Sequence, residues 1–394
     1  MCFNTSPESV AALLKPMSVD VSAWLKIAAT TEIRPEQLTA LLEEFGDANS
    51  LVTGKPAALA ATGLGETAIH RLRSGNEADV EATEAWLSQP ATHLVTWDDE
   101  RYPPLLKTLP DAPALLYVHG DPDSLRFPLI AMVGSRNPTR GGEMTARDFA
   151  IELSQGGFGI ASGLALGIDT AAHAGALHAD GLTIAVLGTG IDRIYPAANL
   201  KLAHAIAASG AIVSEFPLGT VPRRHNFPRR NRLISGLCLG TLVVEAAERS
   251  GSLITARLAA EQGREVFAIP GSIHNPMARG CHRLIRDGAR LVETTDDIFA
   301  ELGALTDLFG TGDTVNTADN QASGDSPAKG TDGEYATLLE ALGWEPCTTN
   351  TLRERSGLTI AEVSSMLLIL ELEGVVEALP GGRYSRLKQA RQIT

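Results

Sequence analysis

A regular alternation of short apolar runs and helical stretches constrains the fold of this chain more than any other feature. Each run is short and ends in small residues, and most runs precede a stretch in which apolar residues recur at helical spacing. Apolar runs that alternate with helices indicate a parallel sheet covered on both faces. We therefore predict an α/β fold with a Rossmann-like doubly wound parallel sheet. The predicted strands lie at residues 93–97, 114–118, 129–133, 159–161, 183–187, 211–214, 241–245 and 265–269. Helices are predicted near residues 141–154, 169–178 and 198–208, and a further helix follows Ser252 and ends at residue 262.

Small residues follow nearly every one of these strands. In a doubly wound sheet, ligands bind beyond the carboxyl ends of the strands. Small residues let a ligand come close to the backbone, and each following helix directs its positive N-terminus toward the same edge. The sequence therefore predicts an edge suited to anionic groups. The small residues concerned are Gly134, Ser135, Ser162, Gly163, Gly188, Gly190, Ser250, Gly251, Ser252, Gly271 and Ser272.

Residues 221–232 contain five arginines and no acid, in a chain whose formal net charge is -14. Charge concentrated against the trend of the chain indicates a local anion site, and the planar fork of arginine suits phosphate. Phe227 lies among these cations, where its ring could stack on a base. Pro222 and Pro228 predict a shaped loop rather than a long helix. A solvated basic loop that forms ion pairs would explain the stretch equally well when it is considered alone.

The N-terminal part has a different pattern, because residues 21–87 show helical spacing of apolar residues. Pro35 suits the first turn of the second helix and Gly46 suits its end. The turn at residues 62–66 contains Gly63 and Gly65, which could present backbone N–H groups to a phosphate or could let two helices pack closely. Little positive charge surrounds this turn, so we favour the structural role. The part resembles a small domain of sterile-alpha-motif or helix-hairpin-helix type.

The C-terminal part predicts a flexible linker and a winged helix. Residues from about 304 to 333 are rich in Gly, Asp, Thr, Ser and Ala and have few apolar anchors. Three predicted helices and a glycine-turn hairpin follow, and Thr359 suits the cap of the third helix. That helix carries acids and no arginine, so we expect a protein contact or a vestigial wing rather than DNA reading. The predicted domains are residues 1–90, 91–303, 304–333 and 334–394.

Composition excludes several classes of protein. The four cysteines show no paired spacing, which argues against a disulfide framework or a zinc site and for a reducing cytoplasm. No apolar run reaches membrane-spanning length, and the N-terminus lacks the features of a secretion signal. A nicotinamide fingerprint and a P-loop are both absent, so we expect no cofactor and no metal. We predict a cytoplasmic protein without a membrane partner.

Several short motifs, each unspecific alone, occur together in this chain. They are Val133-Gly134-Ser135-Arg136; Ser162-Gly163 with Gly167-Ile168-Asp169 and Ala172-His173; Gly188 and Gly190 with Asp192, Tyr195-Pro196 and Asn199; Ser214-Glu215; Asn226-Phe227-Pro228 with Arg230-Asn231-Arg232; Glu245-Ala246 with Ser250-Gly251-Ser252; and Pro270-Gly271-Ser272. In this combination they resemble the DNA-processing protein A family (DprA, also called Smf). The resemblance is dense from about residue 92 to 302 and looser on either side.

This resemblance implies a cytosolic bacterial protein that binds incoming single-stranded DNA during natural transformation. It also implies that the protein hands this DNA to the recombinase RecA, displaces single-strand-binding protein and forms a homodimer through the Rossmann-like domain. We expect Arg136, Arg230 and Arg232 to grip phosphates, and the backbone amides of Ser135 and residues 251–252 to add neutral donors. The full set of predicted DNA-binding residues is Gly134, Ser135, Arg136, Ser162, Gly163, Arg193, Asn226, Phe227, Arg230, Asn231, Arg232, Ser250, Gly251 and Ser252.

An enzyme is the alternative, because acid–base side chains lie near the predicted edge. Asp169, His173, Asp192 and Glu245 could hydrolyse a nucleotide, as in the phosphoribohydrolases that share this general layout. In the competing structural interpretation, Asp169 caps a helix, His173 packs on the inner face of that helix and Glu245 orders an arginine. We favour the structural interpretation and expect no catalytic residue.

Overall fold

The computed structural model describes residues 19–306, 333–344, 346–372, 374–379 and 383–387. Its first part is helical, as predicted for residues 21–87. Pro35 occupies the first position of the second of these helices, and Gly46 ends that helix with a φ of 88°. The helices are α2 (Val21–Ala29), α3 (Pro35–Phe45), α4 (Ala48–Thr53), α5 (Pro56–Ala61), α6 (Glu66–Arg73) and α7 (Glu77–Leu87).

The glycine turn before α6 corrects one detail of the sequence interpretation. A Cβ atom added to Gly65 would meet no other atom within 4 Å, so close helix packing does not explain this glycine. Gly63 has a φ of 85°, a conformation that residues with a Cβ rarely adopt. The turn therefore needs its first glycine for backbone conformation rather than for packing.

The strands form a mostly parallel sheet. Their bounds are β1 (Thr92–Thr96), β2 (Leu115–Gly120), β3 (Leu129–Val133), β4 (Gly159–Ser162), β5 (Thr183–Val186), β6 (Ala211–Ser214), β7 (Gly240–Val243), β8 (Glu265–Ala268) and β9 (Arg290–Leu291). The strand order is β1-β2-β6-β5 for four of these strands and β4-β3-β7-β8-β9 for the other five. The chain divides into a first unit, residues 1–126 with 184–237, and a second unit, residues 127–183 with 238–394.

In the first unit, β5 and β6 are parallel, whereas β2 pairs antiparallel with both β6 and β1. Strands β1 and β2 therefore form an antiparallel part of this mostly parallel sheet. Antiparallel neighbours need no crossover helix, and the connection from β1 to β2 accordingly holds only the four-residue helix α8 (Pro104–Lys107). Helices α11 (Leu200–Ser209) and α12 (Asn226–Gly236) also belong to this unit.

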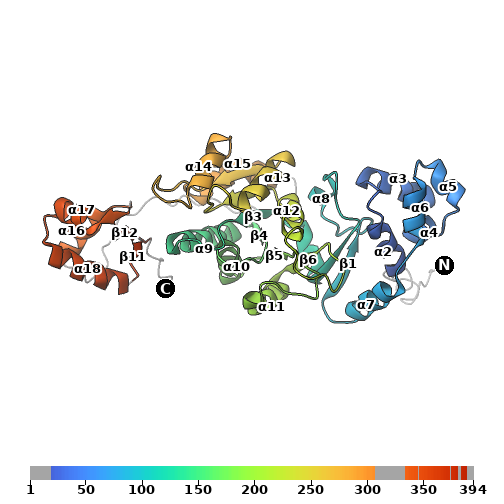
Figure 1. Ribbon diagram of the computed structural model, residues 1–394, viewed down its shortest axis with the longest axis horizontal. Coiled ribbons are helices and arrows are strands. Elements are labelled where there is room, and N and C mark those ends of the chain that lie inside the picture. The colour runs from blue at the N-terminus through green and yellow to red at the C-terminus, as the bar shows by residue number, and fades with distance from the viewer. Residues whose placement is uncertain (1–18, 307–332, 345, 373, 380–382, 388–394) are drawn as a thin grey trace, which may run out of the picture. The chain divides into compact units, whose positions relative to one another are not determined.

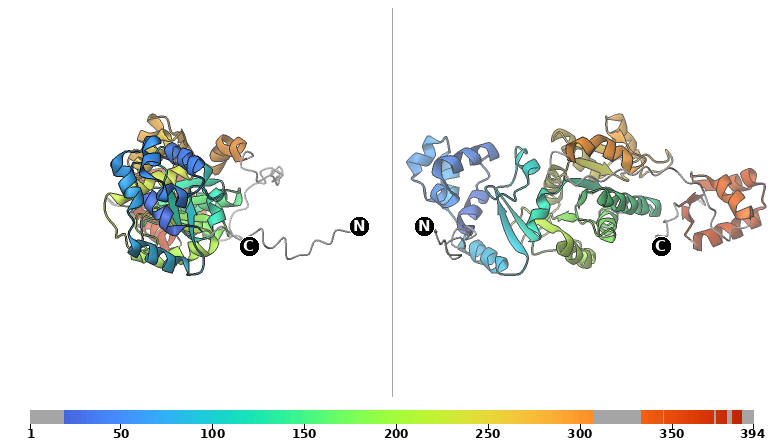
Figure 2. Two further views of the ribbon diagram at one scale, coloured as in Figure 1. Left: turned by 90° about the vertical axis from the view of Figure 1, so that its right-hand side faces the viewer. Right: turned by 180° about the vertical axis from the view of Figure 1, so that it is seen from behind.

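In the second unit, the neighbouring strands from β4 through β3, β7 and β8 to β9 are parallel. The chain moves in one direction from β3 to β4 and in the other from β7 to β8, so right-handed crossovers put their helices on opposite faces. Figures 1 and 2 show helices on both faces of these strands. On one face lie α9 (Arg140–Gln155) and α10 (Ile168–His178), and on the other lie α13 (Ser252–Glu261) and α14 (Arg279–Arg286). The doubly wound arrangement is confirmed.

Helix α12 occupies part of the stretch that was predicted to be a loop. Pro228 is the third residue of this helix. A proline within the first turn removes an N–H group that has no partner inside the helix, so it does not break the helix. The prediction of a loop is therefore wrong from Asn226 onward, and the stretch before it has no helix or strand.

The C-terminal residues form a winged helix with a hydrophobic cluster of its own. Leu338, Leu352 and Leu367 are fully buried in this cluster. Thr359 caps the third helix as predicted, because its hydroxyl accepts from the backbone N–H of Glu362, 3.3 Å away. The predicted linker lies outside the described residues except at its ends. The elements are α15 (Thr295–Thr306) before the linker, then α16 (Gly333–Leu342), β10 (Cys347–Thr348), α17 (Thr349–Ser356), α18 (Ile360–Leu372), β11 (Val376–Leu379) and β12 (Arg383–Arg386).

Two predictions from composition can be compared with the described residues. Cys238, Cys281 and Cys347 are free and buried, and burial raises the pKa of the Cys281 thiol to about 12. Cys2 lies outside the described residues. Within the described ranges, no helix has the length and apolar character needed to cross a bilayer.

Candidate nucleic-acid interface

Helix α12 carries part of the arginine-rich stretch, and two of its arginines are buried. Arg230 is 4% exposed and Arg232 is 8% exposed. Arg230 donates through Nη1 to the backbone carbonyl of Val186 at the end of β5. Arg232 pairs with Glu215 and with Asp111, the latter at 3.2 Å. The prediction that these two arginines grip phosphate therefore needs correction, because both guanidinium groups lie inside the protein and bind its own oxygen atoms.

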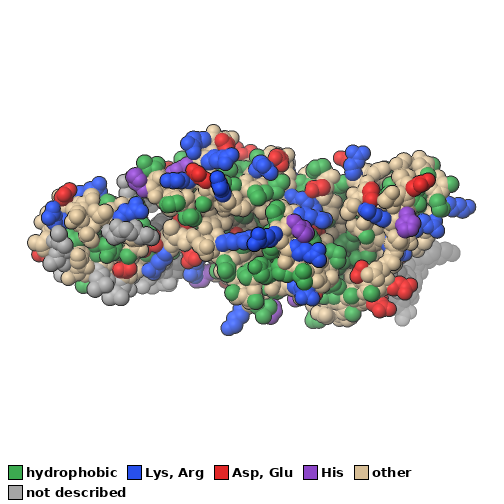
Figure 3. Space-filling view, viewed as in Figure 1, with side chains coloured by type: hydrophobic (Ala, Val, Ile, Leu, Met, Phe, Trp, Pro, Cys, Tyr) green, Lys and Arg blue, Asp and Glu red, His purple; other side chains and the backbone are tan. Residues whose placement is uncertain are grey.

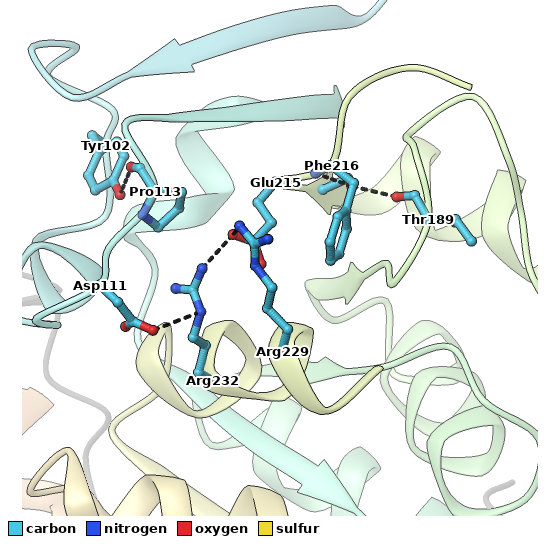
Figure 4. A network of polar contacts seen from close by, with 9 residues as sticks. Tyr102, Asp111, Pro113, Thr189, Glu215, Phe216, Arg229 and Arg232 are labelled. Carbon is cyan, nitrogen blue, oxygen red and sulfur yellow. Dashed lines mark hydrogen bonds and ion pairs between the residues drawn. The ribbon is translucent and has the colours of Figure 1, made fainter. Parts of the chain in front are cut away.

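The arginine-rich stretch contains no acid, but Glu215 pairs with two of its arginines (Figure 4). Its side chain is 2% exposed and pairs with Arg232 and, at 3.2 Å, with Arg229. Burial raises the pKa of the Glu215 carboxyl, whereas the two guanidinium groups oppose that rise by stabilising the carboxylate. Arg229 also lies over the ring of Phe216, 5.4 Å from its centroid. A carboxylate just after β6 thus holds α12 in place.

Asn226 and Phe227, at the start of α12, pack against the turn after β5. The side-chain amide of Asn226 donates to the carbonyl of Gly188 over 3.1 Å. A Cβ atom added to Gly188 would lie 2.9 Å from the Phe227 ring, so this glycine is required for the close approach. The Phe227 ring also contacts Tyr195, with 5.7 Å between centroids. Asn231, also in the predicted set, accepts from the Nε of Arg230 over 3.3 Å.

Four arginines of α12, of the stretch before it and of the turn after β5 remain exposed. Arg193 pairs loosely with Asp192, at 3.7 Å, and its side chain is 51% exposed. The side chain of Arg229 is 56% exposed despite its contact with Glu215. Figure 3 shows basic side chains, with apolar ones among them, around the position that α12 has in Figure 1. We call Arg193, Arg223, Arg224 and Arg229 the cationic surface of the first unit.

Arg223 and Arg224 were not in the predicted set. Both are exposed, and neither forms an ion pair within the part of the chain that the structure describes. Their signal in the sequence was their place directly after Pro222 in a predicted loop, where a side chain has no sheet or helix to pack into. The number of arginines in the whole stretch does not distinguish these exposed side chains from the buried Arg230 and Arg232.

The loop after β3 is held by the residue that follows β7. The backbone N–H of Ser135 donates to the carbonyl of Glu245 over 2.7 Å, and the carbonyl of Ser135 accepts from Ile168. A Cβ atom added to Gly134 would lie 2.6 Å from Ile168. The expected free amide of Ser135 is therefore engaged within the protein. Arg136, the next residue, is exposed.

A carboxylate of the chain itself occupies the N-terminus of α9. Thr139, the N-cap of this helix, donates to Glu245 through its backbone N–H over 2.9 Å and through its hydroxyl over 2.8 Å. A negative group at this position complements the helix dipole. Glu245 is buried at 8% exposure. Glu245 thus orders a helix terminus, whereas the structural interpretation of the sequence expected it to order an arginine.

Asp169 and His173, the other candidates for acid–base chemistry in this unit, also have structural partners. Asp169 does not cap its own helix; its Oδ2 accepts from the backbone N–H groups of Gly163 and Ala165, over 3.1 and 3.2 Å. His173 is fully buried, and its Nδ1 lies 2.7 Å from the hydroxyl of Thr183. Each side chain therefore holds a loop or joins a helix to a strand.

Two serine-containing turns complete the predicted set. Ser162 is fully buried, and its hydroxyl donates to the carbonyl of Met132 over 2.6 Å. The hydroxyls of Ser250 and Ser252 lie 2.7 Å apart, and the backbone N–H of Ser252 donates to Ser250 over 3.3 Å. Gly251, the N-cap of α13, is exposed and has no side-chain cap. The turn after β7 is thus the more accessible of the two.

This arrangement can be compared with known protein families. Residues 93–303 match the family described as DNA recombination-mediator protein A, and residues 322–382 match the DprA winged helix domain. The chain belongs to the DNA recombination-mediator protein A family. The first of these matches covers the loops described above, and the second covers the winged helix as far as β11.

Relatives of known name agree with this membership. The chain is 40% identical over 377 residues to Protein Smf of Escherichia coli, which covers 95% of this chain and 98% of that protein. It is 48% identical over 203 residues to DNA processing protein DprA of Streptococcus pneumoniae, covering 52% of this chain and 72% of that protein. The X-ray structure of the Streptococcus pneumoniae DprA superposes with a TM-score of 0.60 at 36% identity, covering 71% of this chain and 98% of that chain.

Proposed function

We propose that this protein binds single-stranded DNA through the cationic surface of the first unit. In this proposal Arg136 and the turn at residues 250–252 of the second unit also contact the strand. The protein acts in the cytoplasm, protects incoming DNA and loads the recombinase RecA in transformation or recombination. It displaces single-strand-binding protein and works as a homodimer.

One observation carries this proposal. Exposed arginines lie beside the contacting rings of Tyr195 and Phe227, and Phe227 packs on a fixed turn. Arg223 and Arg224 directly precede α12, whose Asn226 is bonded to the turn that packs on Phe227. Proteins that bind single strands without sequence preference combine such cations with rings on which bases stack. Membership of a family described as recombination mediators supports DNA as the ligand.

A salt series with an oligothymidine tests the proposal. Binding that depends on arginine–phosphate contacts releases counterions, so log K should fall linearly with log salt, by about 0.7 per phosphate contact for a single strand. Arg223→Ala and Arg224→Ala should each reduce this slope. An affinity that does not change with salt would contradict the proposal.

A gel shift that compares single-stranded with double-stranded DNA makes the test of this proposal more specific. Stacking requires unpaired bases, so a single strand should bind more tightly than a duplex of the same length. Recombinase loading is tested by following RecA filament formation on a strand coated with single-strand-binding protein, with and without this protein. Equal binding to both strand types would argue against base contacts.

Hydrolysis of a nucleotide is the less favoured function. Asp169 and Glu245 accept hydrogen bonds from backbone amides, and His173 lies inside the protein against Thr183. A general acid or base must reach the group from which it takes a proton, and these partners compete with that role. Incubation with nucleoside monophosphates should release no free base, and release by this protein would favour the enzyme.

A further inference from the structure

Tyr195 is an exposed aromatic residue beside the cationic surface of the first unit, two residues from Arg193. Tyr195 is 49% exposed, whereas Phe227 is half-buried. The two rings are 5.7 Å apart and inclined at 44°. Large aromatic rings usually bury most of their area, so an aromatic ring left half in solvent beside cations needs an explanation.

Hydrogen bonds to its backbone fix the loop that carries Tyr195. The hydroxyl of Thr189 donates to the carbonyl of Arg193 over 2.6 Å, and the N–H of Arg193 donates to Gly190 over 3.0 Å. Gly190 in turn donates to Thr220, at the start of the arginine-rich stretch. The ring of Tyr195 is therefore presented from a stiff loop, which lowers the entropy lost when a ligand contacts it.

The spacing of the two rings shows which side of Tyr195 a base can use. A flat ring inserted between two others needs about 7 Å between parallel faces, because favourable carbon contacts are about 3.5 Å each. Tyr195 and Phe227 are closer than that and are not parallel. A base cannot enter between them, so a base that stacks on Tyr195 would lie on the side of its ring away from Phe227.

The charges around Tyr195 suit a phosphate chain. Arg193 is two residues away in the same loop and is 51% exposed, with only a loose contact to Asp192. Val221, which is 43% exposed, follows Thr220 and leads toward Arg223 and Arg224. An apolar ring bordered by guanidinium groups matches the alternation of bases and phosphates in an unpaired strand.

We propose that Tyr195 stacks on one unpaired base of the bound strand and that Phe227 is a positioning residue for its ring. This inference rests on the proposed function, and it adds a base contact that phosphate binding alone does not require. The stacked base can be of any type, since every base has an aromatic face, and purines should stack more strongly than pyrimidines.

The test uses the full chain and two strands of equal length and equal charge. One is an oligothymidine, and the other is an abasic strand that keeps the sugar and phosphate groups. Tyr195→Ala should weaken oligothymidine binding by roughly 5- to 150-fold, the factor expected for one stacked base. It should leave abasic binding and the salt slope unchanged, because it removes no charge. Tyr195→Phe keeps the ring and should bind both strands as the wild type does.

Leu200→Ala is the matched control, because Leu200 is 46% exposed and lies in the same part of the first unit. It should change neither affinity, and thermal unfolding should show that all variants remain folded. If Tyr195→Ala loses the same factor of affinity for both strands, or loses affinity for neither, the stacking proposal is overturned and the DNA-binding function is left intact. A wild-type protein that binds neither strand would overturn both.

Tyr195→Trp gives a second readout that a purely structural role would not produce. Its additional fluorescence, measured against the wild type, should be quenched on oligothymidine and not on the abasic strand. Unchanged emission on saturation with oligothymidine would contradict direct stacking.

Discussion

In the first unit, exposed arginine side chains are available to an anion. In the second unit, the backbone amides of the glycine turns largely donate to other groups of the protein. In the second unit, Glu245 occupies the N-terminus of α9 and Asp169 occupies the amides of the turn after β4. In the first unit, Arg230 and Arg232 serve the fold, but Arg223 and Arg224 have no such task. Glycine turns after strands are therefore weaker evidence for a phosphate site than their number suggests, because the chain can supply its own anions.

The largest expected effect concerns the acid that holds α12. Glu215→Ala takes from the buried Arg232 its pairing with a carboxylate that is 2% exposed, and it leaves the pairing with Asp111, whose side chain is 62% exposed. Removing one member of a buried pair typically costs about 3–5 kcal/mol of stability. Urea unfolding should show this loss. Glu261→Ala removes an exposed pair with Arg257 and should cost about 0.5 kcal/mol or less. Equal effects of the two substitutions would mean that the Glu215 pair does not hold the first unit together.

The next effect concerns a glycine turn of the second unit. Gly167 has a φ of 81°, and a Cβ atom there would lie 2.4 Å from the backbone oxygen of Ser135. With a ψ of -125° at this φ, Gly167→Ala should cost about 2 kcal/mol for the backbone conformation and about 1 kcal/mol or more for the clash. Gly251→Ala is the control, since its Cβ atom would meet no other atom within 4 Å. Thermal unfolding measures both variants. A Gly167→Ala variant as stable as Gly251→Ala would show that this turn can move.

A smaller loss of stability should follow when the carboxylate of Asp169 is replaced by an amide. Asp169→Asn replaces an ion that accepts two backbone hydrogen bonds in a buried place, so we expect a loss of about 1–3 kcal/mol. Asp180→Asn is the control, because Asp180 has a φ of 52° and asparagine tolerates that region well. Chemical unfolding measures both. If Asp169→Asn also leaves the affinity for oligothymidine unchanged, the amides of Gly163 and Ala165 are structural in the bound state too.

The smallest effect tests whether the second unit contributes a cation. Arg136→Ala should lower affinity for oligothymidine and reduce the slope of log K against log salt by about 0.7, the value for one phosphate contact on a single strand. Arg257→Ala, at a side chain that is 71% exposed on α13, should change the slope less. Unchanged binding by Arg136→Ala would confine the contacts to the first unit.

Periodicity predicted most of the fold because strands and helices here follow local rules. The strand predicted at residues 129–133 matches β3 (Leu129–Val133), and the helix predicted at 169–178 differs from α10 (Ile168–His178) by one residue. Local rules failed at Pro228, where the effect of a proline depends on its position within a helix. The antiparallel pairing of β2 with β6 also could not be read locally, since it joins segments far apart in the chain.

The site was harder to predict than the fold because burial depends on distant partners. The sequence places Arg230 one residue from Arg229, yet Arg230 reaches the end of β5 whereas Arg229 stays exposed. No count of charges along residues 221–232 distinguishes the two. Glu215 belongs to the Ser214-Glu215 motif, but its pairing with Arg232 requires the fold to bring them together.

The buried anchors of α12 have a consequence for the energetics of any ligand that touches the residues before it. Because Arg232 and Asn226 already fix the helix and its first turn, the adjoining backbone has little freedom left to lose on association. A partner of Arg223 and Arg224 then mainly restricts their side-chain rotamers, at about 0.5–1.5 kcal/mol for each. Removing one of these buried anchors should therefore weaken the complex by giving the backbone before α12 more freedom to lose.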